Sequence, residues 1–288
     1  VWVKAAGVDY ARIYVDTVGG NMNGPGVTFS TKNVWNVSAT GVATQTRTSV
    51  DEYPNGWWRL SVSGSFSNRN DYFCHVDLEG GEADVAFNGN GSDGMYVWGA
   101  QFETGSYPSS YIPTNGGVVE RGFDNVVIDE EDFTDFYNPL ESSVLAVGTV
   151  KRPVSAQGQL NIFHVGDSNQ DGHGVFREHG TKDIFYHIRN GNATPTGGNL
   201  VASGYGDWSE GREAKIAIAF KDGDQAISVN GGNQATATVT SSYPTNNITK
   251  MWIGSASGNG SGQFEGTIKR IAYYSKLLTD NQLNTLTA

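Results

Sequence analysis

The chain has 288 residues, of which 38% are hydrophobic and 11% aromatic, so it is long enough to form about two packed domains. Its formal net charge of −11 argues against a general nucleic-acid or anionic-membrane binder, and no run of about 18 apolar residues is present to insert into a membrane. The single cysteine, Cys74, excludes an internal disulfide, and the 38 glycines favour many short strands joined by tight turns over long helices.

The first part of the chain, residues 1–106, is a series of short runs in which apolar and polar residues alternate. We expect strands at residues 1–6, 11–18, 26–31, 57–66, 71–79 and 95–103, with turns at the clusters GGNMNGPG, YPNG and NGNGSDG. A strand spacing near ten residues predicts a β-sandwich of the jelly-roll type. Because residue 1 already lies in the first strand, we expect the chain to begin inside this domain.

Three residues of this part have a predicted place relative to the core. Trp57 and Trp58 are adjacent in a strand and therefore face opposite ways, so one is expected in the core and the other nearer solvent. Cys74 lies in the strand-like run YFCHVDL and is predicted to be a small buried hydrophobe.

Residues 107–118 are predicted to be a linker. Pro108 and Pro113 each remove a ladder donor and fix φ, so no central strand or helix runs through this segment. The surrounding stretch WGAQFETGSYPSSYIPTNGGVVER resembles the segment that joins two β-sandwich modules in tailed-phage virion proteins. The ordered pieces KAAG, NGWWRLSVSGSF and GMYVWGAQFE are similar to the carbohydrate-binding-module-like sandwich of those proteins.

Residues 119–288 are predicted to form a second all-β domain. After an acidic, loop-rich lead, we expect strands at 143–150, 160–166, 172–179, 182–191, 214–220, 225–232, 251–255 and 266–274. Asp222 and Gly223 are typical of a hairpin turn. A short C-terminal helix is predicted from Thr279 and Gln282 at capping-box spacing, with Leu283 and Leu286 facing the sandwich.

This second half resembles a concanavalin A-like (laminin-G-like) lectin module of the kind used in phage fibres. The similar pieces are FDNVVIDEEDFTDFYN, KIAIAFKDGDQAISVNGG and GTIKRIAYYSKLLTDNQLNTL, in that order. The predicted architecture is therefore two tandem jelly-roll β-sandwiches with a short C-terminal helix.

One loop has the spacing of a calcium site. Asp167, Asn169 and Asp171 precede Gly172, and Glu178 follows six residues later, which matches the calcium-loop pattern D-x-[DN]-x-[DN]-G-x5-E. The flanking runs read as strands, so Glu178 is the weakest of these Ca2+ ligands. The alternative is a polar β-hairpin turn, since Asp, Asn and Gly are ordinary turn residues.

Histidine and arginine gather in three neighbouring predicted strands. If these strands are adjacent, Arg177, His179, His187 and Arg189 form a basic, hydrogen-bonding patch that would hold an acidic sugar or a neighbouring subunit. The alternative is an ordinary solvated sheet face. The histidine spacing does not favour zinc, because neither H-x-H nor H-x3-H is present.

Three aromatic residues near turns or strand ends are candidates for stacking on sugars. They are Trp57, Tyr243 and Trp208. Trp208 is the first candidate, because the residues on both sides of it are polar and typical of a loop. The alternative for each is a core or rim aromatic. The carboxylate groups Glu82–Asp84 and Glu130–Asp135 do not fit the spacing of a glycosidase pair, so we predict no catalytic site and no enzyme.

The resemblance implies a module of a phage virion fibre or surface appendage that binds a host-surface polysaccharide non-covalently. Its other partners would be virion proteins and further copies of itself, a trimer among the options. It would lie on the virion surface after assembly in the host cytoplasm. Two alternatives stay open, namely a purely architectural capsid or tail decoration and a part of a polysaccharide-degrading enzyme.

Overall fold

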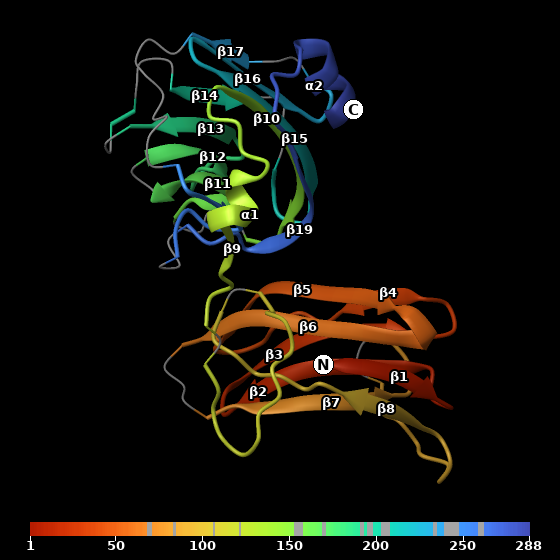
Figure 1. The fold of residues 1–288 in the computed structure, drawn as a ribbon. Helices are drawn as coiled ribbons and strands as arrows, with labels where there is room; N and C mark the ends of the chain where they lie inside the picture. The colour runs from red at the N-terminus through yellow and green to blue at the C-terminus, as the bar shows by residue number, and fades with distance from the viewer. Residues whose placement is uncertain are drawn as a thin grey trace. The chain divides into compact units, whose positions relative to one another are not determined.

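The computed structural model of the chain describes residues 1–67, 71–82, 85–105, 107–120, 122–152, 158–168, 171–190, 193–194, 198–202, 208–232, 235–238, 248–258 and 262–288. The chain divides into two compact units, unit 1 (Val1–Arg121) and unit 2 (Gly122–Ala288). Each unit is built from two antiparallel sheets, so the predicted all-β class is confirmed (Figure 1). Within the described ranges, no helix has both the length and the apolar content needed to cross a membrane.

Unit 1 consists of two four-stranded sheets with the strand orders β5-β6-β1-β8 and β4-β3-β2-β7. Its core lies between them and includes Val3, Ile13, Val27, Trp58 and Leu60. Trp58 is buried while Trp57 is half-buried on the opposite face, which confirms the predicted difference between the two tryptophans. The strands are β1 (Trp2–Ala6), β2 (Tyr10–Thr17), β3 (Gly20–Thr28), β4 (Asn33–Asn36), β5 (Ala43–Tyr53), β6 (Trp57–Phe66), β7 (Phe73–Glu79) and β8 (Gly94–Trp98), with a short 3-10 turn at Pro54–Gly56.

The expectation of a turn at GGNMNGPG is wrong, because these residues form most of β3. The glycines serve close packing there: a Cβ added to Gly26 would lie 2.2 Å from the indole of Trp35, the residue paired with Gly26 on β4. The strands β4 and β5 were not expected. The alternation of polar residues such as Thr, Ser and Gln in β5 is a weak signal beside the strongly apolar runs.

The strand β8 ends earlier than its predicted end at residue 103. Gly99 follows Trp98 with φ +62°, a left-handed conformation that breaks the ladder and favours glycine. The ring of Trp2 packs against this position, since a Cβ on Gly99 would lie 2.7 Å from it. The chain therefore leaves the sheet directly after Trp98.

Unit 2 consists of a five-stranded sheet, β17-β16-β15-β10-β19, and a six-stranded sheet, β14-β13-β12-β11-β18-β9. Large apolar side chains from both sheets meet between them, among them Ile162, Phe163, Tyr186, Ile216 and Phe220. The elements are β9 (Val126–Asp129), α1 (Glu130–Thr134), β10 (Glu141–Val150), β11 (Leu160–Ser168), β12 (Asp171–Arg177), β13 (Ile184–Arg189), β14 (Asn199–Ala202), β15 (Glu213–Lys221), β16 (Asp224–Val229), β17 (Ala235–Ala237), β18 (Lys250–Ile253), β19 (Gly266–Tyr274) and α2 (Asp280–Thr287).

The hairpin and the C-terminal helix of unit 2 were predicted correctly. Lys221 pairs with Asp224 around the turn, and Gly223 has φ +79°. Thr279 and Gln282 form the capping box of α2. Leu283 is fully buried in a cluster on the outer face of the five-stranded sheet, so α2 covers that face.

The acidic lead of unit 2 was expected to be loop-rich. Residues 122–125 and 135–140 are loops, and the lead also contains β9 and α1, whose Phe133 is fully buried. One local expectation is wrong. Cys74 was expected to be buried, but it is exposed although it pairs with Val15 on the core-facing side of β7. The reason is that Cys74 lines a cavity of about 650 Å³ in unit 1.

Candidate functional site

The outer face of the β5-β6-β1-β8 sheet carries an aromatic surface assembled by strand register. One cross-strand row is Tyr53–Trp57–Lys4–Tyr96, and the next is Asp51–Arg59–Trp2–Trp98. Directly opposed residues in antiparallel strands project from the same face of a sheet. The two rows therefore form one surface, which we call the aromatic platform, made of Trp2, Lys4, Asp51, Tyr53, Trp57, Arg59, Tyr96 and Trp98 together with Tyr111, which packs on it.

Ring contacts hold the middle of the platform in place. The Trp2 and Trp98 ring centroids are 5.0 Å apart, and Trp98 and Tyr111 are 4.8 Å apart. The guanidinium carbon of Arg59 lies 4.5 Å from the Trp2 ring centroid, a cation–π distance. Arg59 also donates from Nη2 to the carbonyl oxygen of Ser109 at 2.6 Å. The predicted linker is thus fastened to unit 1.

Three aromatic rings of the platform are exposed to solvent and so are accessible for stacking on a ligand. Tyr96, Trp98 and Tyr53 keep 60%, 53% and 41% of their surface exposed. Lys4 and Arg59 are half-buried between these rings. Flat apolar faces flanked by charged donors and the Asp51 carboxylate suit a ligand with both C–H surfaces and hydroxyl groups.

The outer face of the six-stranded sheet of unit 2 carries a second polar and aromatic row, which we call the histidine row. It runs Val127–Trp252–His164–Gly174–His187–Asn199, with one residue from each strand. The His164 and His187 ring centroids are 5.7 Å apart, and Phe176 lies 4.9 Å from His187. A Cβ on Gly174 would lie 3.0 Å from Nδ1 of His164, so glycine there makes room for the ring.

The histidine row is buried, unlike the platform. His164, His187 and Trp252 keep 0%, 5% and 8% of their surface exposed. Burial lowers the pKa of His187 well below its usual value, with smaller contributions from His164 and Arg189. His187 is therefore a neutral imidazole. Its Nε2 and the indole N–H of Trp252 are buried with no hydrogen-bond partner among the residues that the structure describes.

The predicted basic patch does not form, because strand register separates its members. Arg177 pairs with Ile184, while His187 and Arg189 pair with Gly174 and Gly172. Arg177 therefore points to the core side of the sheet, and His187 and Arg189 point to the outer side. The prediction assumed that odd-numbered residues of β12 and β13 share a face. In the structure, odd-numbered residues of one strand lie opposite even-numbered residues of the other.

Arg177 and the leading candidate Trp208 are both buried. The Nη1 group of Arg177 donates to the carbonyl oxygens of Arg152 and Trp208, each at 3.2 Å. The indole N–H of Trp208 donates to the carbonyl oxygen of Gly148 at 3.1 Å, and its exposed fraction is 0%. The expectation that Trp208 is an exposed stacking residue is wrong, because its polar neighbours in sequence lie around a side chain that enters the core.

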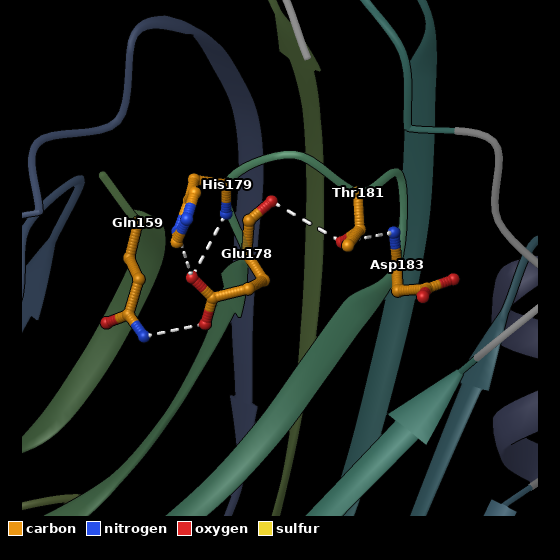
Figure 2. A network of polar contacts seen from close by, with 5 residues as sticks. All are labelled: Gln159, Glu178, His179, Thr181 and Asp183. Carbon is orange, nitrogen blue, oxygen red and sulfur yellow. Dashed lines mark hydrogen bonds and ion pairs between the residues drawn. The ribbon is translucent and has the colours of Figure 1, made fainter. Parts of the chain in front are cut away.

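Figure 2 shows where Glu178 and His179 lie. Glu178 accepts from Gln159 Nε2 at 2.9 Å and contacts Nδ1 of His179 at 2.8 Å, while the backbone N–H of Asp183 donates to Thr181 in the same turn. Partial burial makes the largest single contribution and acts to raise the pKa of the Glu178 carboxyl. The hydrogen bonds from Gln159 and from the ring and backbone N–H of His179 together hold this pKa below its usual value. This network orders the turn between β12 and β13 and occupies both carboxylate oxygens of Glu178.

The structure separates Glu178 from the predicted calcium ligand Asp171. Asp171 starts β12 and Glu178 follows its end, so the seven-residue strand places them roughly 24 Å apart. Asp167 accepts from Thr249 at 3.0 Å and lies 3.8 Å from the ammonium of Lys250. Within the described part of the chain, no group of three or more His, Cys, Asp or Glu residues is placed to hold a metal ion.

Two predicted site residues, Asn169 and Tyr243, lie outside the described residues. Calcium binding by Asp167, Asn169 and Asp171 stays a prediction. Of the candidate carboxylates, Glu82 accepts from Thr28 and Asn33 at 2.9 and 2.6 Å, and Asp84 lies outside the described residues. Glu130 and Asp132 belong to the first turn of α1.

Residues 150–284 match the family model of the concanavalin A-like lectin/glucanases superfamily, a laminin G type. The matched residues lie within unit 2. The comparison with curated proteins gives no match.

Among solved structures, the chain is similar to the CBM40 of the Ruminococcus gnavus IT-sialidase bound to α2,6 sialyllactose, with 15% identity and a TM-score of 0.47 over 59% of this chain and 96% of that one. It is also similar to a leech intramolecular trans-sialidase, with 19% identity and a TM-score of 0.47, and to the NanB sialidase of Streptococcus pneumoniae, with 20% identity and a TM-score of 0.44. The alignments cover 57% of this chain and 26% of each of these two enzymes.

Of the two predicted aromatic candidates that the structure describes, Trp57 lies on the platform and Trp208 does not. Sequence reasoning missed Trp2, Tyr96 and Trp98 as site residues, although the alternation in WVK and YVW gives their shared face. The sequence did not reveal that β1 pairs with both β6 and β8, because these are long-range contacts.

Proposed function

We propose that this protein is a non-covalent glycan-binding module and that the aromatic platform of unit 1 is its glycan-contacting surface. The observation that carries the proposal is the set of exposed rings, Tyr53, Tyr96 and Trp98, held in register on one sheet face. Sugar rings present C–H surfaces that stack on aromatic faces and hydroxyl groups that need polar partners nearby. The platform offers both.

The dimensions of the platform favour an oligosaccharide over a single sugar. Each row crosses four strands, and neighbouring strands are about 4.8 Å apart, so the rows are roughly 14 Å wide. Trp98 and Trp2 lie near the edge formed by β8, and Tyr53 lies on the opposite edge strand β5. A chain of several sugar units would contact rings on both edges.

The lectin-type domain of unit 2 supports the same class of function. Its histidine row is closed by burial, so this row serves as a packed layer while ligand contact is assigned to unit 1. Binding by a single platform would be weak and would gain strength when several copies act together.

For the biological setting, we propose a fibre or surface appendage of a tailed-phage virion, with a host-surface polysaccharide as ligand and other virion proteins and further copies of the chain as partners. This rests on the resemblance of the stretch from Trp98 to Arg121 and of the two domain sequences to such virion proteins.

A second candidate function is a purely architectural one, in which the platform contacts another protein. It is favoured by the same exposure, because contiguous exposed aromatic surface also marks protein interfaces. In the first function the purified chain binds a glycan, whereas in the second it binds another protein and retains no glycan.

The deciding experiment is a glycan-array screen of the purified chain and of two variants, W98A and V118A. Trp98 is an exposed ring of the platform, whereas Val118 is 99% exposed and is not part of it, so V118A is the matched control. We expect specific retention that W98A reduces and V118A leaves unchanged. No retention on any glycan by a folded, assembled sample would reject glycan binding and favour the architectural role.

A further inference from the structure

The aromatic platform carries two cationic side chains on its central strands, Lys4 of β1 and Arg59 of β6. Lys4 lies directly opposite Trp57, two residues before Arg59, so the two cations are diagonal neighbours on one sheet face. Diagonal neighbours across an antiparallel pair are about 7–8 Å apart. One ligand group can therefore contact both side chains.

No acidic residue occupies the positions that surround Lys4 on this face. The directly opposed residues are Trp57 and Tyr96. The residues two positions away along the three segments are Trp2, Ala6, Asn55, Arg59, Gly94 and Trp98. With the residues that the structure describes, the ammonium of Lys4 forms neither an ion pair nor a cation–π contact. Its charge is therefore available to a ligand.

Arg59 is held in place by contacts that do not neutralise its charge. Its Nη2 group donates to the uncharged carbonyl oxygen of Ser109 at 2.6 Å, and its guanidinium carbon lies 4.5 Å from the Trp2 ring centroid. Trp2 lies on β1, so the guanidinium is directed away from Asp51, its neighbour on β5. Arg59 and Asp51 form no ion pair, although both belong to the described residues. A guanidinium carries several N–H groups, so donors remain for a ligand.

The segment that holds Arg59 contains an acid, Glu103, whose carboxylate is already occupied. Its Oε1 accepts from the backbone N–H of Ser109 at 2.7 Å and from Nε2 of Gln101 at 3.0 Å. Its Oε2 accepts from the hydroxyl of Ser109 at 2.6 Å. Glu103 thus fixes the residue whose carbonyl holds Arg59, and it does so without forming an ion pair with the guanidinium.

A carboxylate is the ligand group that suits these two cations. Hydrogen bonds from a guanidinium or an ammonium to a carboxylate are about twice as strong as those between neutral groups. The exposed rings of Tyr96 and Trp98 lie beside Lys4 and can stack on the sugar ring that bears the carboxylate. The net charge of −11 disfavours a ligand with a phosphate or sulfate on every unit, because repulsion grows with the charge of the ligand.

We propose that the platform takes an acidic oligosaccharide, in which a sugar carboxylate binds Lys4 and Arg59 while sugar rings stack on Tyr96 and Trp98. The exposed carboxylate of Asp51, at the β5 end of its row, accepts from sugar hydroxyl groups. This inference rests on the proposed function of the platform and adds the class of sugar. The rings supply contact area, and the two cations supply the choice of an acidic over a neutral sugar.

The test is an array on which each uronic-acid oligosaccharide is printed beside its carboxyl-reduced partner, in which a hydroxymethyl group replaces the carboxylate. The two members of a pair differ in charge and hardly in size, so the ratio of their retention reports on carboxylate recognition. Sulfated and phosphorylated oligosaccharides are printed on the same array. We expect the unchanged chain to retain the acidic member roughly tenfold more than its reduced partner.

Three variants assign this ratio to Lys4. K4M keeps the apolar stem of the side chain and removes the charge, and we expect the ratio to fall below about threefold. K4R restores a cation and is expected to recover the ratio. The matched control K221M makes the same change in net charge at the exposed hairpin of unit 2, and it is expected to leave the ratio unchanged. Urea unfolding establishes that each variant is folded.

The possible failures of this inference and of the proposed function give different results. Equal retention of both members of each pair by the unchanged chain would overturn the acidic class and leave glycan binding intact. The same fall in ratio in K4M and K221M would also overturn it, because net charge would then be the cause. Stronger retention on sulfated or phosphorylated members, lost in K4M, would overturn the assignment to a carboxylate. No retention on any oligosaccharide, acidic or neutral, would reject the glycan-binding function itself.

Discussion

The outer faces of the two sheets that carry aromatic and histidine residues differ in one property, exposure. The platform of unit 1 and the histidine row of unit 2 are both cross-strand rows with one residue from each strand. Trp98 of the platform is 53% exposed, whereas Trp252 of the row is 8% exposed. The same residue types thus form a contact surface in one unit and a packed layer in the other.

This difference teaches that residue type and strand register do not by themselves define a binding surface. Both faces place aromatic rings beside polar groups, which is the composition expected of a sugar-binding site. Burial decides which face can bind, because a ring without accessible surface cannot stack on a ligand.

The largest expected effect is the contrast between a buried and an exposed tryptophan. We expect W208A to lower the free energy of unfolding by about 3–5 kcal/mol, because the indole is fully buried and its N–H bonds to Gly148. The control W98A removes an exposed ring, and the expected change is below about 1 kcal/mol. Urea unfolding of both variants measures this. Equal losses would contradict the assignment of Trp98 to an open surface.

Acid is expected to destabilise unit 2 through its buried histidines. Burial, with a smaller effect of His164, lowers the pKa of His173 to about 3, and the pKa of His187 is also well below 6.5. The unfolded chain therefore binds protons that the folded chain excludes, so stability is full above about pH 6.5 and falls as the pH decreases toward the folded pKa.

The expected slope is about 1.4 kcal/mol per pH unit for each of the two histidines below pH 6.5. Pulse proteolysis in urea at pH 7 and pH 5, with fragments assigned to each unit, measures it. The double variant H173F/H187L is expected to flatten the slope. A slope that this variant leaves unchanged would show that other groups control the acid response.

Removing a ring of the platform is expected to lower the affinity for glycans. W98A removes an exposed ring that contacts Trp2 and Tyr111, and we expect roughly a tenfold loss of affinity for a glycan that the chain retains, about 1.4 kcal/mol. Titration calorimetry with the free oligosaccharide measures it. The variant F176L changes the closed face of unit 2, and its affinity is expected to match that of the unchanged chain. A loss with F176L and none with W98A would move the site to unit 2.

The smallest effect concerns the imidazole of His187 in the histidine row. We expect H187L to keep or raise the stability at pH 7 by up to about 1 kcal/mol, because His187 Nε2 is buried with no hydrogen-bond partner among the described residues. Thermal unfolding measures it, with F176L as the control for a simple change in packing. A loss above about 2 kcal/mol would indicate that the imidazole is satisfied by a group such as bound water.

The fold could be read from the sequence where the local signals are strong. Alternation and turn residues gave most strands of unit 2, and Thr279 with Gln282 gave the capped helix α2. The strand β3 was missed because its glycines and Pro25 are typical of a turn, although here they allow the close approach of Trp35. Long-range packing overrode the local preference.

The site was harder to predict because it depends on pairing between distant strands. Trp57 was identified as a candidate, but its neighbours in the platform come from β1 and β8, about 55 and 40 residues away in sequence. The predicted patch of Arg177 and His187 failed for the same reason, since a shift of one residue in register moves a side chain to the other face. Register is a property of the assembled sheet.

The contact between Gly26 and Trp35 has a consequence for the evolution of this domain. The indole occupies the space that any side chain at position 26 would need, with a nearest approach of 2.2 Å to an added Cβ. A substitution at either position alone therefore creates a clash or a void, and the two positions are free to vary only as a pair. Among descendants of this sequence, we expect glycine at 26 and tryptophan at 35 to be inherited or replaced together.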